Sequence, residues 1–138
     1  MRVRRIETGA QAERYRLYSV CSARGDSELE EFLIKHAGEA VAILRCLSDA
    51  AESGPHSLGT SRCHYIDQQN KIYELIGGRL RVAFFTDSDR IVICTHGFPK
   101  STQGTPSQEK KTAARTRKAY FEAKESGSLL FEEPEEEN

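Results

Sequence analysis

Residues 71–106 constrain the fold most, because they have the composition of three short strands joined by tight turns. Their sequence, KIYELIGGRLRVAFFTDSDRIVICTHGFPKSTQGTP, is rich in Ile, Val, Phe and Tyr and is interrupted by Gly-Gly and by Asp-Ser-Asp. Gly77 and Gly78 both tolerate the positive φ that a two-residue hairpin turn requires. The sequence therefore predicts an antiparallel meander whose first turn consists of these two glycines.

The predicted hairpin has two unlike faces, since side chains two apart in a strand point the same way. One face is apolar and is expected to lie under helices: Tyr73, Leu75, Leu80, Val82 and Phe84. On the other face Glu74 would lie opposite Arg81. Arg79 would lie opposite Ile76 on the same face. Two arginines near one acid indicate a site for a polyanion; the alternative is an ion pair on an outer sheet face, worth about 0.2–1 kcal/mol.

The segments before the meander predict one strand and two helices. Residues 14–20 alternate as a strand does, and residues 62–66 are a possible short strand. Ser27 and Glu30 form a capping-box pattern, so a helix should begin there. A second helix is expected over residues 39–52, and its core face should consist of Val41, Leu44, Leu47 and Ala51.

A last helix follows the meander, from an N-cap at Thr105 to about residue 124. This helix is strongly basic, and a basic helix is either a solvated face or a contact with RNA or a protein partner. The order of elements indicates an α+β fold.

Length and charge divide the chain into three parts. At 138 residues it has the size of one domain, for which we expect a flexible basic arm (1–13), a single domain (14–125) and an acidic, disordered tail (126–138). Five of the 21 acids lie in the last seven residues, so residues 1–131 hold 16 acidic and 20 basic side chains. The tail is either a solvated end or a segment that folds back over a basic site.

Several classes of protein are disfavoured. No stretch has the roughly 18 apolar residues of a membrane span, and the first 20 residues lack the apolar core of a signal peptide, so we expect a cytoplasmic protein with no membrane partner. The four cysteines show no CxxC spacing. Cys63-His64 and Cys94-Thr95-His96 could supply zinc ligands, but adjacent strand residues point to opposite faces, so we expect reduced cysteines and neither metal nor cofactor.

The ordered motifs of the meander resemble the RelE/HigB superfamily of bacterial and phage toxins. The matching residues are Tyr73-Glu74-Leu75, Arg81-Val82, Phe84-Phe85, His96-Gly97-Phe98, Lys100, Thr102 and Thr105-Pro106. The resemblance is closest to a HigB-type, phage-derived branch that ends in HGF-x-K-K-T-x-x-T-P and a helix. It implies a curved, mainly antiparallel sheet of about four strands, similar to microbial ribonucleases, with two N-terminal helices packed on one side and a C-terminal helix.

The resemblance also implies a function and its partners. Such toxins are mRNA interferases that enter the A site of the 30S subunit, cleave the message there and are silenced by a cognate antitoxin with a helix-turn-helix domain. Two departures stand out: family members commonly carry a basic residue where this chain has Ile76, and a second lysine where it has Ser101. Arg79, opposite Ile76 in the predicted register, would compensate for the first.

Metal-independent RNA cleavage requires attack of a ribose 2′-OH on the adjacent phosphate, stabilisation of the added charge and two proton transfers. Arg81 suits the phosphate, since its planar fork grips two oxygens, with Arg79 in support and Lys100 on the backbone or leaving oxygen. Glu74 is expected to orient Arg81, and either His96 or His64 to act as general acid or base.

The turn between the second and third strands determines where His96 points. A two-residue loop would place His96 on the face of Arg81, and a three-residue loop would place it on the opposite face. Further RNA contacts are expected from Thr102, Lys110, Lys111, Arg115 and Lys118.

Three functions are therefore compatible with the sequence. The first is a ribosome-dependent endoribonuclease toxin. The second is a toxin-fold binding module without nuclease activity, either a degenerate toxin or an inhibitor of another target such as gyrase. The third is an unrelated small α+β interaction domain.

Overall fold

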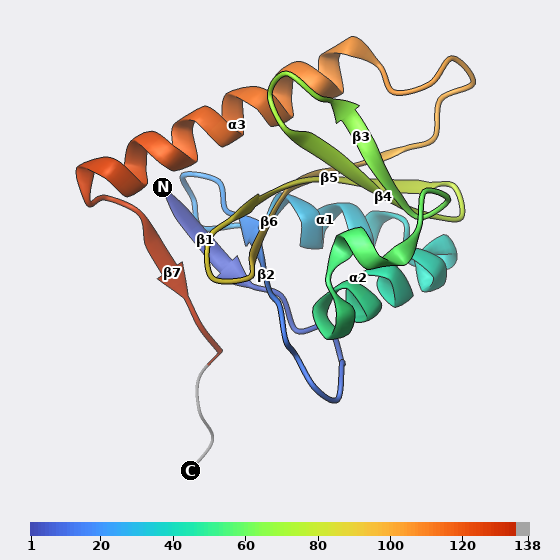
Figure 1. Cartoon of the computed structure of the whole chain (residues 1–138), viewed down its shortest axis with the longest axis horizontal. Helices are drawn as coiled ribbons and strands as arrows, with labels where there is room; N and C mark the ends of the chain where they lie inside the picture. Colours follow the sequence, from blue (N-terminus) through green and yellow to red (C-terminus); the bar gives the residue numbers. More distant parts are fainter. Residues whose placement is uncertain (135–138) are drawn as a thin grey trace.

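A seven-stranded mixed sheet with helices on both faces forms the framework of the protein (Figure 1). The computed structural model describes residues 1–134. The strands are β1 (Arg2–Arg5), β2 (Arg16–Val20), β3 (Cys63–Asp67), β4 (Ile72–Gly77), β5 (Leu80–Asp87), β6 (Ile91–Pro99) and β7 (Leu130–Glu132), in the order β3-β4-β5-β6-β2-β1-β7. The helices are α1 (Glu28–Lys35), α2 (Val41–Ser53) and α3 (Ser107–Ser126), with short 3₁₀ helices η1 (Ala37–Glu39) and η2 (Pro55–Leu58).

The predicted α+β class is confirmed, whereas the predicted strand number is too low. The strands expected over residues 14–20 and 62–66 are present as β2 and β3. The β3–β6 meander is antiparallel, and β2 joins it by pairing parallel to β6. The two additional strands, β1 and β7, come from chain ends for which the sequence predicted no regular structure.

Both predicted chain ends therefore need correction. Residues 2–5, expected in a flexible arm, form β1, and residues 130–132 of the expected disordered tail form β7 parallel to it. Glu132 accounts for the docking, because its carboxylate lies 2.9 Å from both Arg2 Nε and Arg4 Nε. Both segments were too short to give a strand signal, and the pairing of β7 with β1 joins residues more than 120 positions apart. The rest of the predicted tail, residues 135–138, lies outside the described residues.

The register of the β4–β5 hairpin differs from the prediction by two residues. Gly77 is a strand residue paired with Leu80, and the turn consists of Gly78, with φ +60°, and Arg79. A Cβ on Gly77 would lie 2.3 Å from the Cα of Ile43, so this glycine permits α2 to approach the sheet. Because the shift is even, each residue keeps its predicted face.

The shift changes the cross-strand partners. Ile76 lies opposite Arg81, and Glu74 lies opposite Ala83. The predicted pairings of Glu74 with Arg81 and of Arg79 with Ile76 are therefore wrong, and Arg79 does not compensate for Ile76.

A β-bulge in β6 decides the orientation of His96. The loop after Asp87 has three residues, which alone would put His96 on the face opposite Arg81. The register then shifts between Ala83 and Phe84, so that Ala83 pairs with His96 and Phe84 with Cys94. The extra residue, Thr95, returns His96 to the face of Arg81.

Two helices cover the face that carries Leu75, Val82 and Phe84. The predicted capping of α1 is confirmed: the Ser27 hydroxyl accepts from the Glu30 backbone N–H at 3.1 Å. The predicted core face of α2 is correct for its second half only: buried are Ile43, Cys46, Leu47, Ala50 and Ala51. Val41 and Leu44 are 74% and 48% exposed, because α2 turns Ile43 towards β4, where Gly77 leaves room for its backbone.

The third helix, α3, covers the opposite face through Ala113, Tyr120 and Ala123. Asp87 at the end of β5 fixes its C-terminal half. The carboxylate accepts from Tyr120 Oη at 2.7 Å and from Lys124 Nζ at 2.9 Å, although only 6% of the Asp87 side chain is exposed. Burial opposes ionisation of Asp87, but the bonds from Lys124, Tyr120 and the Ser88 backbone outweigh it and lower the pKa of this carboxyl.

Replacing Asp87 by asparagine should destabilise the protein by about 1–3 kcal/mol at pH 7, since Lys124 and Tyr120 lose a charged acceptor. A carboxyl with a lowered folded-state pKa contributes its stability above the unfolded pKa of about 3.9, and the contribution is lost as pH falls. Urea unfolding of both proteins should therefore show a difference at pH 7 that shrinks towards pH 3. A constant difference would contradict an electrostatic role for Asp87.

Candidate functional site

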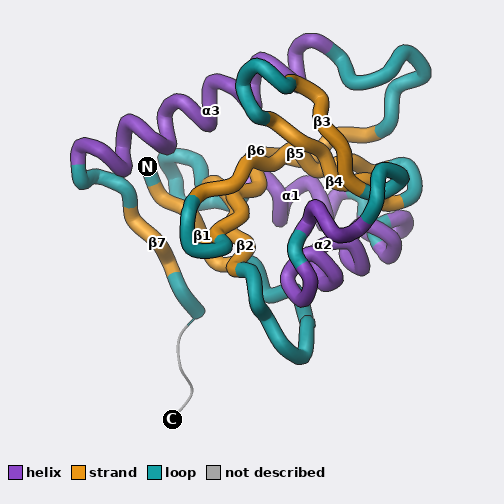
Figure 2. Tube along the Cα trace, viewed as in Figure 1, coloured by secondary structure: helices purple, strands orange, loops and turns teal. Residues whose placement is uncertain are grey.

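A cavity of about 330 Å³ lies on the α3 face of the sheet, at the end that carries β3, β4 and β5. Residues of the strands and of the loop that joins β6 to α3 line it. Figure 2 shows the course of this loop between β6 and α3. Its lining consists of His64, Glu74, Ile76, Arg81, Phe98, Lys100, Ser101, Thr102, Gly104 and Thr105. Four of the predicted site residues, Glu74, Arg81, Lys100 and Thr102, thus line one cavity.

Glu74 lies at the base of this cavity and is only 4% exposed. Its Oε1 lies 2.8 Å from His64 Nε2, and its Oε2 accepts a hydrogen bond of 3.1 Å from the Thr105 hydroxyl. The predicted role of Thr105 as N-cap of α3 is wrong, because the helix begins one residue later, with Pro106 at the N-cap position. Thr105 instead connects the loop to the buried carboxylate.

His64 extends from β3, directly opposite Glu74 on β4. Its Nδ1 lies 3.2 Å from the Thr60 carbonyl oxygen, while its Nε2 meets the Glu74 carboxylate. Both ring nitrogens therefore lie within hydrogen-bond distance of an oxygen atom. With 42% of its side chain exposed, His64 can reach a bound molecule and still contact Glu74.

Arg81 presents a cation to the same cavity from β5. Its guanidinium donates to the backbone oxygens of Gly78 and Leu80, at 2.9 and 3.0 Å, and within residues 1–134 it forms no ion pair. The predicted orientation of Arg81 by Glu74 is therefore wrong; carbonyls of the hairpin turn hold it instead. Both of these bonds use Nη1, so the other N–H groups of the guanidinium can donate to a bound anion.

Lys100 lies just after β6, and its backbone N–H donates to the Arg79 carbonyl at 2.7 Å. The hairpin turn and the loop are thereby joined at the cavity rim. The side chain of Arg79 is exposed at the turn and does not line the cavity, so its predicted supporting role lacks a structural basis.

His96 shares the face of Arg81, but it is only 9% exposed and does not line the cavity. Its Nδ1 lies 2.8 Å from the Thr95 hydroxyl, and its Nε2 lies 3.5 Å from Glu109 Oε2 on α3. The second contact has the length of an ion pair but lacks hydrogen-bond geometry. The sequence named His96 as the candidate catalytic histidine, with His64 as the alternative. The structure places His64 in the cavity, whereas His96 lies under α3 beside Glu109.

Three of the four predicted basic residues on α3 lie along one side of the helix. Lys111, Arg115 and Lys118 follow the spacing of successive turns and are exposed, and Lys110 is partly buried nearby. In the part of the chain that the structure describes, none of the four forms an ion pair. A basic strip therefore extends along α3 from the end of the helix that borders the cavity.

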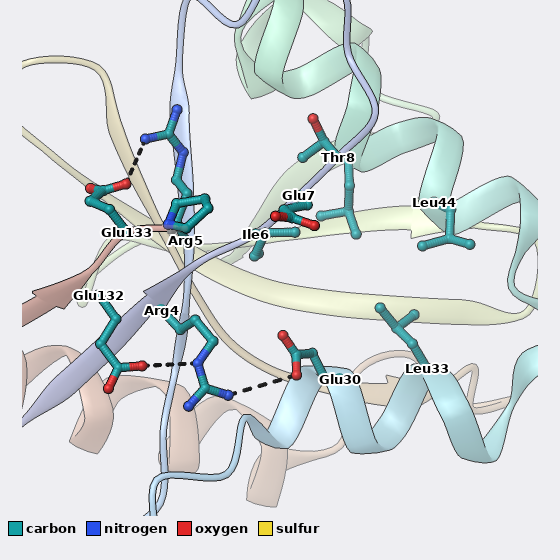
Figure 3. Close-up of a pocket in the computed structure, with 12 residues that line it drawn as sticks. Arg4, Arg5, Ile6, Glu7, Thr8, Glu30, Leu33, Leu44, Glu132 and Glu133 are labelled. Atoms are coloured by element: carbon teal, nitrogen blue, oxygen red, sulfur yellow. Dashed lines mark hydrogen bonds and ion pairs between the residues drawn. The ribbon is translucent and has the colours of Figure 1, made fainter. Parts of the chain in front are cut away.

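A larger cavity, of about 410 Å³, lies between β1, α1, α2 and the C-terminal segment (Figure 3). Its arginines already have carboxylate partners: Arg4 Nε lies 2.9 Å from Glu132, and Arg5 lies 3.0 Å from Glu133. The apolar side chains of Leu33 and Leu44 line its other end. With its cations neutralised, this cavity is less suited to a phosphate than the smaller one.

All four cysteines lie within the described residues, and each is a buried free thiol. Burial raises the pKa of Cys94 to about 12 and that of Cys63 to about 11. Cys63 packs in the core below α2, while His64 points into the cavity on the other face. Within residues 1–134 no group of three or more His, Cys, Asp or Glu side chains is arranged to hold a metal ion.

None of the helices in the described part of the chain has the length and apolar character needed to cross a membrane.

The fold and the cavity define a small α+β protein with a polar, cation-bearing site beside a basic helix. The family model described as "Phage derived protein Gp49-like (DUF891)" matches residues 28–118, and the chain belongs to this family. Gp49-like proteins are associated with the toxins of toxin–antitoxin systems, so an antitoxin is the partner that the family suggests. A search of curated proteins found no match.

Proposed function

We propose that this protein is a RelE/HigB-type toxin that cleaves mRNA on the ribosome as a metal-independent endoribonuclease. The observation that supports this proposal is the convergence of a buried carboxylate, an imidazole and two cations in one cavity of about 330 Å³. These groups match the needs of transesterification: charge stabilisation at phosphorus and two proton transfers.

In this mechanism the ribose 2′-oxygen attacks the adjacent phosphorus, and the bond from phosphorus to the 5′-oxygen of the next nucleotide breaks. Glu74 accepts the 2′-hydroxyl proton, since a carboxylate has acceptor positions beyond those used by His64 and Thr105. His64 is the general acid and gives a proton to the departing 5′-oxygen. The products are a 2′,3′-cyclic phosphate and a 5′-hydroxyl end.

Arg81 and Lys100 bind the phosphate as its charge increases in the transition state. Because Arg81 is held by two backbone carbonyls, little reorganisation is needed when the phosphate arrives. The basic strip on α3, with Lys111, Arg115 and Lys118, would follow the RNA or ribosomal backbone away from the cavity.

We expect Arg81→Ala to reduce mRNA cleavage about 10²–10³-fold, the loss typical of removing a donor to a developing anion. Arg79→Ala, two residues away in the exposed turn, should change cleavage less than about threefold, since surface changes outside a site have small effects. The measurement is the mapping of new 5′ ends on mRNA in a purified translation reaction, together with thermal unfolding of each variant.

Equal losses in both variants would contradict the assignment of the phosphate to the cavity, as would cleavage that survives Arg81→Ala. A wild-type protein that produces no cuts in translated frames would refute the nuclease itself.

A second candidate is a Gp49-like toxin that binds its target without cleaving RNA. The observation in its favour is that both departures from the RelE/HigB pattern, Ile76 and Ser101, line the cavity itself. Ile76 lies directly opposite Arg81, so one neighbour that family members commonly make basic is here apolar. Growth arrest on expression without new 5′ ends, relieved by a co-expressed helix-turn-helix antitoxin, would favour this candidate.

A further inference from the structure

A stack of aromatic rings ends at the outer margin of the sheet, on the strand that carries His64. Tyr65 of β3 lies directly across from Tyr73 of β4, with ring centroids 4.2 Å apart and planes inclined by 27°. Tyr73 in turn stacks on Phe84 of β5, at 5.3 Å and 19°. Phe84 is fully buried, so the stack begins in the core and continues outwards to the sheet edge.

Two contacts hold the outer rings in place. The Tyr73 hydroxyl donates to the Tyr65 hydroxyl at 2.8 Å, and His56 of η2 packs edge-on against Tyr73 at 4.5 Å. Burial, reinforced by the bond to Tyr65, raises the pKa of Tyr73 to about 12, so that the donating hydroxyl stays protonated at neutral pH. The Tyr65 ring is therefore ordered before any ligand arrives, which lowers the entropic cost of binding on it.

The outer face of Tyr65 is uncovered. The side chain is 46% exposed, although Tyr73 covers one face of its ring. β3 is the terminal strand of the sheet (Figure 1). Among the described residues, Tyr73 is the aromatic ring that stacks on Tyr65. A flat aromatic surface thus lies open at the edge of the sheet, on the face opposite the cavity.

The position of Tyr65 relative to that site follows from strand geometry. His64 and Tyr65 are adjacent in β3, so their side chains lie on opposite faces of the sheet. His64 enters the cavity with Glu74, and Tyr65 joins the stack on the other side. A flexible chain that leaves the cavity over the edge of β3 therefore meets the open ring of Tyr65 next.

We propose that a base of single-stranded RNA stacks on the outer face of Tyr65, next to the nucleotide whose phosphate occupies the cavity. This inference rests on the proposed function and adds a base-binding subsite to it. Stacking on an aromatic side chain strengthens binding about 5- to 150-fold per base and accepts every base, because each has a π face. Tyr65 is thus a binding residue that contributes affinity and register, with a modest preference for purines.

The test uses the full chain and ribosomes programmed with an mRNA whose A-site codon is 2′-O-methylated, so that it binds without being cut. A 2-aminopurine base is placed in turn at each codon position and at the following nucleotide, and its fluorescence is followed as protein is added. Tyr65→Phe keeps the ring and loses only the hydroxyl contact, whereas Tyr65→Leu keeps an apolar side chain and loses the π surface.

We expect wild type and Tyr65→Phe to quench one of the positions and to bind within about twofold of each other. Tyr65→Leu should bind about 5- to 50-fold more weakly and abolish that quenching. Equal binding and quenching by Tyr65→Leu, with wild type bound, would overturn the stacking subsite and leave the nuclease proposal intact. Wild-type protein that does not bind the programmed ribosome would overturn both.

Discussion

Replacing Glu74 by glutamine is expected to lower mRNA cleavage about 10²–10⁴-fold while leaving the protein folded. Glutamine has nearly the same shape and keeps an acceptor for the Thr105 hydroxyl, but it cannot take a proton from the 2′-hydroxyl and gives His64 no carboxylate partner. The rate of appearance of cyclic-phosphate ends under single-turnover conditions measures the loss. Binding to programmed ribosomes should be nearly unchanged, because Arg81 and Lys100 remain.

The chain contains a matched control for this substitution. Glu109 on α3 also lies beside a histidine, His96, at 3.5 Å, but neither residue lines the cavity. Glu109→Gln should therefore leave cleavage within about threefold of wild type and change thermal stability slightly. If Glu109→Gln were the variant that abolished cleavage, the proton transfers would belong to His96 rather than His64.

His64→Gln completes the comparison. Loss of cleavage in both Glu74→Gln and His64→Gln, with no further loss in the double variant, would indicate that the pair acts as one unit. Independent, additive losses would assign the two residues to separate steps. Retained cleavage in both single variants would refute the mechanism.

The sequence predicted the strands of the meander, the faces of its hairpin and the start of α1, because these depend on local patterns. The alternation of side chains determines which face a strand residue occupies. The N-cap of α1 needs only Ser27 and Glu30, which are three residues apart in the sequence. The faces stayed correct even though the hairpin register shifted, since a shift of two residues preserves alternation.

The site was predicted only in part, because its contacts depend on packing between distant elements. Glu74, Arg81 and Lys100 were placed together correctly, but the partner of Glu74 is His64 on β3, a strand with a weak signal. His96 was brought to the right face by a bulge and then covered by α3, neither of which local sequence indicates. β7 was likewise missed, since it is ordered by arginines at the other end of the chain.

Gly77→Ala is expected to cost about 3 kcal/mol or more of folding free energy. The added methyl group would clash with backbone atoms, which cannot move aside by a change of side-chain rotamer. The added Cβ would lie 2.3 Å from both the Cα and the backbone nitrogen of Ile43. α2 would have to move away from β4, and the apolar contacts of Ile43 and Leu47 with the sheet would loosen. Urea unfolding, followed by far-UV circular dichroism, measures the difference from wild type.

Alanine substitutions at two further glycines, Gly78 and Gly97, distinguish the effect of packing from that of turn geometry. At Gly78, with φ +60°, the nearest atom to an added Cβ is 3.8 Å away, so Gly78→Ala should cost only the left-handed strain of about 1–2 kcal/mol. At Gly97 the added Cβ would lie 2.2 Å from the ring of Phe32, a side chain that can turn aside, so an intermediate cost is expected. If the loss of folding free energy is largest for Gly77→Ala, intermediate for Gly97→Ala and smallest for Gly78→Ala, contact with α2 fixes the hairpin register. If Gly78→Ala causes the largest loss, the turn fixes the register instead.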